Sequence, residues 1–383
     1  MRVSRRCTRV AGMELTELLR VAERVKAIDI ALGIPAADPP APVVDAAVAA
    51  LRAGRHQYAD PAGLPELRAA LAAGLRRTHG IDVDPATELT ITCGATEALF
   101  ATLLAVTDPG DEVVVVQPCY ESYVGMVELV GAVPVVVGLR TDGWRLDPAD
   151  LAAAVSARTR AIILNTPHNP TGRVFDAAEV GGVLRLCRER GLVCVTDEVY
   201  DHYVFDGARH RSPLSLPGGR EHVVLAGSLS KTLNATGWRI GFCVADPATT
   251  SAIRRVHERT TIGTNRPMQH GAAALALDSL GDNRSWVQQQ RDLMVDRLTA
   301  MGFAVFRPEG GWFLMADTRP LGVPAGALCR DLVERAGVLV APGETFFAEG
   351  GEDRWLRMTF VRDPAATRDA LDRIERFLAD RTG

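Results

Sequence analysis

The 383-residue sequence lacks several features that mark common classes of protein. Its net charge is only −4, so it has no basic excess of the kind that nucleic-acid-binding proteins carry. Its seven cysteines form no CxxC pair and accompany no paired histidines, which argues against a zinc site or a disulfide framework and favours a reducing compartment. No apolar run approaches the ~18 to 20 residues of a membrane span. We therefore expect a cytoplasmic protein with no metal, no nucleic acid and no membrane partner.

What the sequence contains is typical of a soluble globular protein. It is 47% hydrophobic and 23% charged, and it is long enough for two or three units with their own cores. The first nine residues are basic, but no apolar core follows them, so they do not form a secretory signal. We interpret them as a short solvated arm or as the result of a mis-assigned start upstream of Met13.

Seven apolar runs rich in β-branched residues predict the strands of one sheet. Most are separated by segments with helical spacing, such as residues 177–190. Near-continuous apolar strands joined by helices are typical of a mainly parallel sheet that helices cover on both faces. The runs lie at residues 89–93, 112–116, 133–137, 161–164, 192–196, 223–226 and 240–244. The fold class is therefore α/β, with a large domain built on a mainly parallel seven-stranded sheet.

The two ends of the chain predict a smaller α+β domain. Residues 14–27 have helical spacing and lead into a short strand at Ile28 and a loop rich in Gly and Pro. The last eighty or so residues contain further strand and helix patterns. We divide the chain into residues 1–45, an N-terminal arm and part of the small domain; residues 46–285, the large domain; and residues 286–383, the C-terminal small domain.

Polar side chains directly follow several of the predicted strands. Each has an ordinary explanation as a helix cap, a turn or an exposed side chain. In an open parallel sheet, however, ligands bind at the carboxyl ends of the strands, where these side chains would meet. They are the Gly94-Ala95-Thr96 turn, Tyr120, Asn165, Asn169, Asp197, Tyr200, Ser228 and Lys231. Their convergence at one edge predicts a common binding site.

A phosphorylated pyridine aldehyde needs this combination of groups. Its phosphate would bind the small-residue turn at Gly94, together with Ser228 and Arg239. A carboxylate keeps the pyridine nitrogen protonated, and only the protonated ring accepts electrons well. A desolvated lysine has a lowered pKa and can form an imine with the aldehyde. The cofactor that the sequence predicts is pyridoxal 5'-phosphate.

Three motifs, taken in order, resemble those of the class I/II aminotransferases, which are fold-type I pyridoxal-phosphate enzymes. They are Asn169-Pro-Thr-Gly172, Asp197-Glu-Val-Tyr200 and Ser228-Leu-Ser-Lys231 with Gly237-Trp-Arg239. The resemblance runs from about Ile30 to the C-terminus. Two further segments are most similar to the kynurenine, glutamine and methionine aminotransferase-like branch, namely Gly94-Ala-Thr-Glu-Ala-Leu99 and Pro308-Glu-Gly-Gly-Trp-Phe313.

The resemblance implies a role toward the cofactor for each of these positions. Lys231 would form the imine and carry protons, and Asp197 would pair with the pyridine nitrogen. Asn169 and Tyr200 would hydrogen-bond the phenolic oxygen of the ring, and Tyr120 would stack on its face. The phosphate would be held by Gly94, Ala95, Thr96, Ser228 and Arg239.

The resemblance also implies a substrate site and a second subunit. Arg357 lies in a predicted strand among Leu356 and Met358 and would clamp the substrate α-carboxylate with its planar fork. Gly33, Asn165 and Asn169 would line the same carboxylate site. Tyr58 would reach the phosphate of the neighbouring subunit, so the expected assembly is a homodimer with shared active sites.

The implied reaction moves an amino group between an L-amino acid and a 2-oxo acid by a ping-pong mechanism. Two alternatives stay open. The first is a pyridoxal-phosphate-dependent lyase, cyclase or oxidase of a natural-product pathway, because the chain reads Gly33-Ile-Pro-Ala-Ala where the family has Gly-x-Pro-Asp-Phe. The second is a non-catalytic sensor of amino compounds. We also hypothesise that Arg266, in a segment that approaches the partner's active site in the family, influences selection of the substrate side chain.

Overall fold

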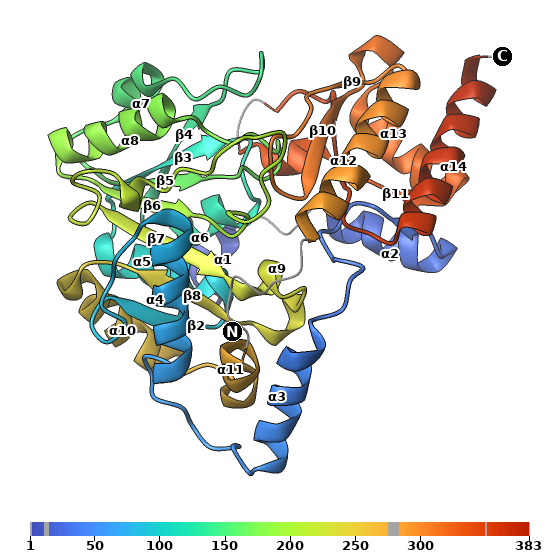
Figure 1. Cartoon of the computed structure of the whole chain (residues 1–383). Helices are drawn as coiled ribbons and strands as arrows, with labels where there is room; N and C mark the ends of the chain where they lie inside the picture. Colours follow the sequence, from blue (N-terminus) through green and yellow to red (C-terminus); the bar gives the residue numbers. More distant parts are fainter. Residues whose placement is uncertain (1, 11–14, 275–282, 349–350, 383) are drawn as a thin grey trace.

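The computed structural model describes residues 2–10, 15–274, 283–348 and 351–382, and within them the chain forms two lobes (Figure 1). The larger lobe surrounds a central sheet drawn in cyan, green and yellow. The smaller lobe contains the orange and red C-terminal part together with the blue helix α2 (Leu15–Val25). Helix α2 therefore joins the C-terminal part in the smaller lobe, whereas helix α1 (Arg5–Arg9) contacts the larger lobe.

The sheet of the larger lobe has seven strands in the order β2-β8-β7-β6-β5-β3-β4. Strand β8 is antiparallel to both of its neighbours, and the other pairs are parallel. The strands are β2 (Leu89–Thr92), β3 (Glu112–Gln117), β4 (Val133–Gly138), β5 (Thr159–Asn165), β6 (Val193–Asp197), β7 (Val223–Ser228) and β8 (Gly241–Val244). The prediction of a mainly parallel seven-stranded sheet is confirmed.

The apolar character of the strands follows from burial on both faces. Val113, Val114 and Val115 of β3 point alternately to opposite faces, yet all three are fully buried. Val113 and Val115 join one core cluster, and Val114 joins another. Helices cover both faces of the sheet (Figure 1), among them α5 (Gly94–Val106), α6 (Ser122–Val130), α7 (Pro148–Ala154), α8 (Ala177–Arg190) and α10 (Pro247–Thr260).

Helix α8 shows how local sequence sets the ends of these elements. Asp176 accepts hydrogen bonds from the backbone N–H groups of Ala178 and Glu179, and Glu179 bonds back to the N–H of Asp176, which forms a capping box. At the other end Gly191 adopts a left-handed conformation that costs glycine little. The helix therefore spans the residues that its apolar spacing predicted.

The remaining helices of this lobe flank the edge of the sheet. They are α1 (Arg5–Arg9), α3 (Ala41–Arg52), α4 (Pro65–His79), α9 (Leu229–Thr232) and α11 (Arg266–Ala273). Helices α3 and α11 pack side by side at the bottom of Figure 1. The first nine residues were expected to form a solvated arm, but part of this arm packs against the larger lobe. Helix α1 contacts α6, and Arg6 donates a hydrogen bond to the carbonyl oxygen of Leu129.

The smaller lobe joins the N-terminal segment to the C-terminal third. Strand β1 (Ile28–Asp29) pairs in parallel with β11 (Val338–Leu339). A second sheet has the order β12 (Ala341–Pro342), β13 (Trp355–Thr359), β10 (Phe313–Asp317) and β9 (Ala304–Val305), and the helices are α12 (Asn283–Ala300), α13 (Ala325–Asp331) and α14 (Pro364–Thr382). The domain boundaries at residues 45 and 285 stay a proposal.

Among the described helices, none combines the length and the apolarity needed to cross a lipid bilayer.

Candidate active site

A cavity of about 350 Å³ lies at the carboxyl ends of β5, β6 and β7. The strands are in register there, so that Asn165 lies beside Asp197 and Asp197 beside Ala226. Ten predicted site residues line the cavity: Ala95, Thr96, Tyr120, Asn165, Asn169, Asp197, Tyr200, Ser228, Lys231 and Arg239. It is also lined by four residues that the sequence did not single out: Leu99, Tyr123, Val199 and Ser230.

Lys231 enters the cavity from the short helix α9, which begins where β7 ends. Ser228 caps this helix by accepting a hydrogen bond from the N–H of Ser230 at 3.1 Å. The Nζ atom of Lys231 lies 4.8 Å from the centre of the Trp312 ring and 5.8 Å from that of Tyr200. Burial, together with the nearby charge of Arg239, lowers the pKa of Lys231 to about 8. A useful fraction of the amine is therefore neutral near pH 8.

Asp197 is a second buried ionisable residue that lines the same cavity. Its Oδ2 atom accepts a hydrogen bond from the hydroxyl of Tyr123 at 2.7 Å. Burial raises the pKa of Asp197 to about 6, and the hydrogen bond from Tyr123 opposes this rise. The carboxylate is thus ionised at neutral pH and can pair with a pyridinium nitrogen.

Tyr123 is a site residue that the sequence reading missed. It is the second residue of α6 and follows Tyr120, which precedes the helix, by three positions. The two rings lie 5.5 Å apart in an edge-to-face arrangement. The spacing could have indicated Tyr123, but only the fold shows that its hydroxyl meets Asp197.

The first turn of α5 forms the predicted anion-binding turn. Gly94 has a φ of +75°, and a Cβ atom there would lie 2.3 Å from Nη2 of Arg239. A Cβ on Gly241 would lie 2.3 Å from the carbonyl carbon of Gly94. Glycine at both positions lets the guanidinium of Arg239 approach the helix N-terminus, where Ala95 and Thr96 line the cavity. A helix N-terminus beside a guanidinium suits a phosphate group.

Arg357 is held between two aromatic rings in the smaller lobe. Its guanidinium carbon lies 4.1 Å from the ring centre of Phe313 and 4.2 Å from that of Phe346. It donates hydrogen bonds to the carbonyl oxygen of Ala31 at 3.0 Å and to Oδ1 of Asn169 at 3.3 Å. This stacking fixes the plane of the fork, as bidentate binding of a carboxylate requires.

Two other predicted carboxylate-site residues lie near this fork. A Cβ on Gly33 would be 2.6 Å from the Phe313 ring, so a larger residue would displace the ring that stacks on Arg357. Asn165 donates to the carbonyl oxygen of Asp197 at 2.9 Å and accepts from the N–H of Asn169 at 2.7 Å. Asn165 therefore also fixes the backbone that carries Asp197 and Asn169.

Five predicted residues are not among those that line the cavity: Gly33, Gly94 and Arg357, described above, together with Tyr58 and Arg266. Tyr58 is 80% exposed, and Arg266 begins α11. Cys119, which directly precedes Tyr120 in the chain, is buried, and this burial raises its pKa to about 12. It is therefore a neutral thiol at physiological pH, with the character of a small apolar side chain.

The cavity combines a buried amine, a carboxylate, a flat aromatic ring and a phosphate-binding turn on an α/β sheet, a set that defines a lysine-dependent pyridoxal-phosphate enzyme. The model of the family "Aminotransferase class I and II" matches residues 25–374, and the chain belongs to this family. Members of the family use pyridoxal phosphate. The chain is a pyridoxal-phosphate-dependent aminotransferase.

Similar proteins extend over nearly the whole chain. The sequence is 37% identical over 381 residues to the probable N-succinyldiaminopimelate aminotransferase DapC of Mycobacterium tuberculosis (strain H37Rv), covering 95% of this chain and 96% of that one. It is 35% identical to the aspartate/prephenate aminotransferase of Thermus thermophilus, covering 92% and 91%. The solved structure of N-succinyldiaminopimelate aminotransferase from Mycobacterium tuberculosis superposes with a TM-score of 0.94 at 36% identity, covering 98% of this chain and 100% of that chain.

Proposed function

We propose that pyridoxal phosphate binds in the 350 Å³ cavity in the orientation that the sequence predicted. The observation that carries this proposal is the pair formed by Lys231 and Asp197, an amine and a carboxylate buried in one cavity with pKa values of about 8 and about 6. The phosphate would meet the first turn of α5, Ser228 and Arg239. Tyr120 would lie against the ring, and Asn169 and Tyr200 would face its phenolic oxygen.

These side chains can perform the steps of transamination. When bound, the cofactor supplies an aldehyde carbon for amine exchange and a ring that accepts electrons. Asp197 keeps the proton on the ring nitrogen. Arg357 orients the substrate α-carboxylate, which places the α-hydrogen within reach of Lys231. Because its pKa is lowered, Lys231 can accept that proton near pH 8 and return it at the cofactor carbon.

The proposed substrates are an L-amino acid and a 2-oxo acid that react in turn by a ping-pong mechanism. The named activities of the relatives differ in the substrate, and they include N-succinyldiaminopimelate, aspartate/prephenate and methionine aminotransferases. A lyase, cyclase or oxidase would use the same amine and ring. The experiment below separates these reactions.

We also propose a homodimer with shared active sites. Tyr58 is exposed, as are the apolar side chains of Leu51 in α3 and Ile262. A Cβ on Gly263, which follows Ile262, would lie 3.7 Å from the carbonyl oxygen of Ala59, which follows Tyr58, so these two exposed segments lie side by side. Exposed apolar side chains that lie together are typical of a contact surface. A cytoplasmic location is supported by the seven cysteines, all of which are unpaired.

The test is to add single L-amino acids to the purified protein without any acceptor. The visible absorbance of the lysine-bound cofactor, the 2-oxo acid and ammonia are measured together. We expect loss of the absorbance with one equivalent of 2-oxo acid and no ammonia. Ammonia released over many turnovers would instead indicate a lyase or an oxidase, and no response to any amino acid would favour a sensor.

A further inference from the structure

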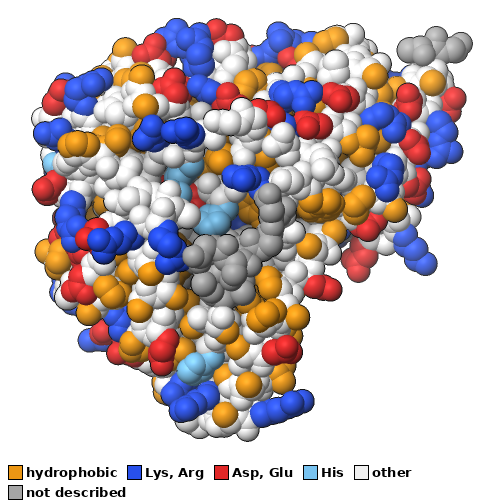
Figure 2. Space-filling view, in the orientation of Figure 1, with side chains coloured by type: hydrophobic (Ala, Val, Ile, Leu, Met, Phe, Trp, Pro, Cys, Tyr) orange, Lys and Arg blue, Asp and Glu red, His pale blue; other side chains and the backbone are white. Residues whose placement is uncertain are grey.

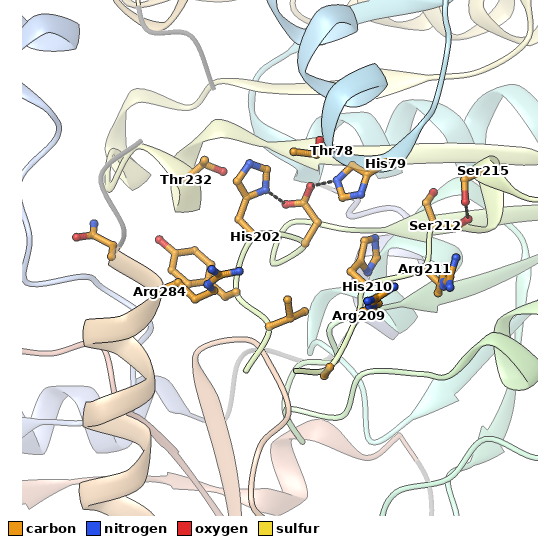
Figure 3. Close-up of a pocket in the computed structure, with 15 residues that line it drawn as sticks. Thr78, His79, His202, Arg209, His210, Arg211, Ser212, Ser215, Thr232 and Arg284 are labelled. Carbon is orange, nitrogen blue, oxygen red and sulfur yellow. Dashed lines mark hydrogen bonds and ion pairs between the residues drawn. The ribbon is translucent and has the colours of Figure 1, made fainter. Parts of the chain in front are cut away.

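A second cavity, of about 660 Å³, lies on the other side of the turn that follows β6. It is separate from the candidate active site but adjoins it, because Thr232, the neighbour of Lys231, lines it. Tyr203 also lines it and donates a hydrogen bond to the carbonyl oxygen of Lys231 at 3.1 Å. Three of the eight histidines of the chain line this cavity, namely His79, His202 and His210 (Figure 3). This concentration of imidazoles has no role in the transamination described above.

Two of these histidines share one carboxylate. Nε2 of His79 lies 2.9 Å from Oδ2 of Asp201, and Nδ1 of His202 lies 2.6 Å from Oδ1. Figure 3 shows His79 and His202 on either side of the carboxylate, joined to it by dashed lines. One ligand atom from each residue lies within 4.8 Å of the other two. In a tetrahedral zinc site with bonds near 2.1 Å the ligand atoms are about 3.4 Å apart, so small rotations would suffice to accommodate an ion.

The three residues come from the end of one helix and from one turn, and they are largely buried. His79 is the last residue of α4, and Asp201 and His202 belong to the turn after β6. Their side chains are only 11%, 17% and 26% exposed. Both carboxylate oxygens of Asp201 face an imidazole nitrogen, Oδ2 that of His79 and Oδ1 that of His202, so the three side chains already converge on one point.

A third histidine, His210, lies beside His79 and offers a further ring nitrogen. Nε2 of His210 lies 2.7 Å from Oε2 of the buried Glu198, while its Nδ1 is buried with no hydrogen-bond partner among the described residues. The side chain of His210 is 3% exposed, and its ring centre lies 5.3 Å from that of His79. A carboxylate on one nitrogen leaves the other with a free electron pair, an arrangement found around metal ions.

The positive charges near the cavity lie at its outer edge. Arg209, Arg211 and Arg284 also line it, and all three are exposed. The space-filling view shows histidine side chains near the middle of this face with Lys or Arg side chains around them (Figure 2). Water and salt screen exposed charges strongly, so these arginines oppose a bound cation less than their number suggests.

We infer that His79, Asp201 and His202 form a binding site for one divalent transition-metal ion such as Zn²⁺, with its open positions facing the second cavity. Two imidazoles and one carboxylate are a ligand set that suits zinc, and three protein ligands leave room for water. The ion would tie the end of α4 to the turn that directly follows Tyr200. This reverses the expectation from sequence, which found no metal site because His79 and Asp201 are 122 positions apart.

The test uses the purified full chain with its bound cofactor, stripped of metal and titrated with Zn²⁺ alone. We expect one tight equivalent per chain by calorimetry and an increase in the thermal midpoint of unfolding. His79→Gln and His202→Gln should each weaken binding by about 100-fold or more. His222→Gln is the matched control, since His222 bonds to the carbonyl oxygen of Leu192 outside this cluster, and it should bind Zn²⁺ like the parent.

A spectroscopic measurement avoids dependence on the variants alone. Co²⁺ bound to the parent protein should give visible absorption bands typical of low coordination number, and one equivalent of Zn²⁺ should remove them. Absence of a tight equivalent in the parent would overturn the inference. So would binding that is unchanged in both variants, because the ion would then lie elsewhere. The absorbance of the cofactor, followed in parallel, reports any Zn²⁺ that binds in the active site instead.

Discussion

Nη1 of Arg357 lies 3.9 Å from Oε2 of Glu121, at a point where both side chains are largely buried. That oxygen of Glu121 has no hydrogen-bond partner among the described residues. Glu121 directly follows Tyr120, so its negative charge lies at the edge of the candidate substrate site. The carboxylate of Glu121 near Arg357 would repel the side-chain carboxylate of an acidic substrate.

We expect Glu121→Gln to favour acidic amino donors. Removing the charge should raise kcat/KM for aspartate and glutamate relative to methionine by about 10-fold, since charges a few ångströms apart in a partly buried site interact by more than 1 kcal/mol. The measurement is the ratio of the two kcat/KM values. Glu128→Gln is the control, because Glu128 belongs to α6, the helix that begins directly after Glu121. An unchanged ratio would show that Glu121 does not face the substrate side chain.

Lys231→Met should stabilise the cofactor-free protein while it abolishes transamination. Below pH 8 the amine is protonated in both the folded and the unfolded chain, and its burial costs about 3 kcal/mol, given a pKa of about 8 against 10.5. Between pH 8 and 10.5 the folded chain loses its proton first, so stability rises with pH and the cost disappears. Urea unfolding at pH 7 and pH 10.5 measures this difference. Lys26→Met, at an exposed position, is the control and should change neither free energy of unfolding. A Lys231→Met protein that is no more stable than the parent at pH 7 would contradict the prediction.

Tyr123→Phe should weaken retention of the cofactor at acid pH. The Tyr123 hydroxyl lowers the pKa of Asp197 from what burial alone would give, so its loss should move that pKa further above 6. Protonated Asp197 cannot pair with a pyridinium, and the pH at which half of the cofactor is lost should rise by about one to two units. Gel filtration across a pH series, with absorbance of the retained cofactor, measures the midpoint. Tyr203→Phe should leave the midpoint unchanged, because Tyr203 bonds to a backbone carbonyl instead.

Arg266→Ala tests the hypothesis that this residue selects the substrate side chain in the dimer. Arg266 begins α11, and its Nε is buried with no hydrogen-bond partner among the described residues. If it faces the partner's site, its loss should lower kcat/KM for acidic donors by about 10-fold or more and spare neutral donors. Equal relative efficiencies across both classes of donor would show that Arg266 has no part in selection.

Much of the fold could be predicted from the sequence because the signals are local. All seven strands of the large sheet correspond to apolar runs, since burial on both faces favours apolar residues over most of their length. Lys231, Asp197 and Asn165 could be placed at one edge because parallel strands end together. Arg357 was predicted to lie within a strand, and it does.

Other relationships depend on contacts between distant segments and left no local signal. The hydroxyl of Tyr123 meets Asp197 across 74 positions, and Arg357 meets Asn169 across 188. Trp312 faces Lys231 from the other lobe, although the motif that contains it had been noted. No periodicity or spacing rule relates such pairs.

The sequence by itself determined the succession of strands and helices along the chain, the α/β class and the types of chemical group at the strand ends. These follow from burial patterns and turn residues, which act over a few positions. Only the tertiary structure decided which groups share a cavity. It placed Tyr123 on Asp197 and two phenylalanine rings around Arg357, and it gathered His79, Asp201 and His202 at a second cavity. The physical reason is that these contacts depend on how α4, α6 and the smaller lobe pack against the sheet, and packing is set by the whole chain rather than by any one segment of it.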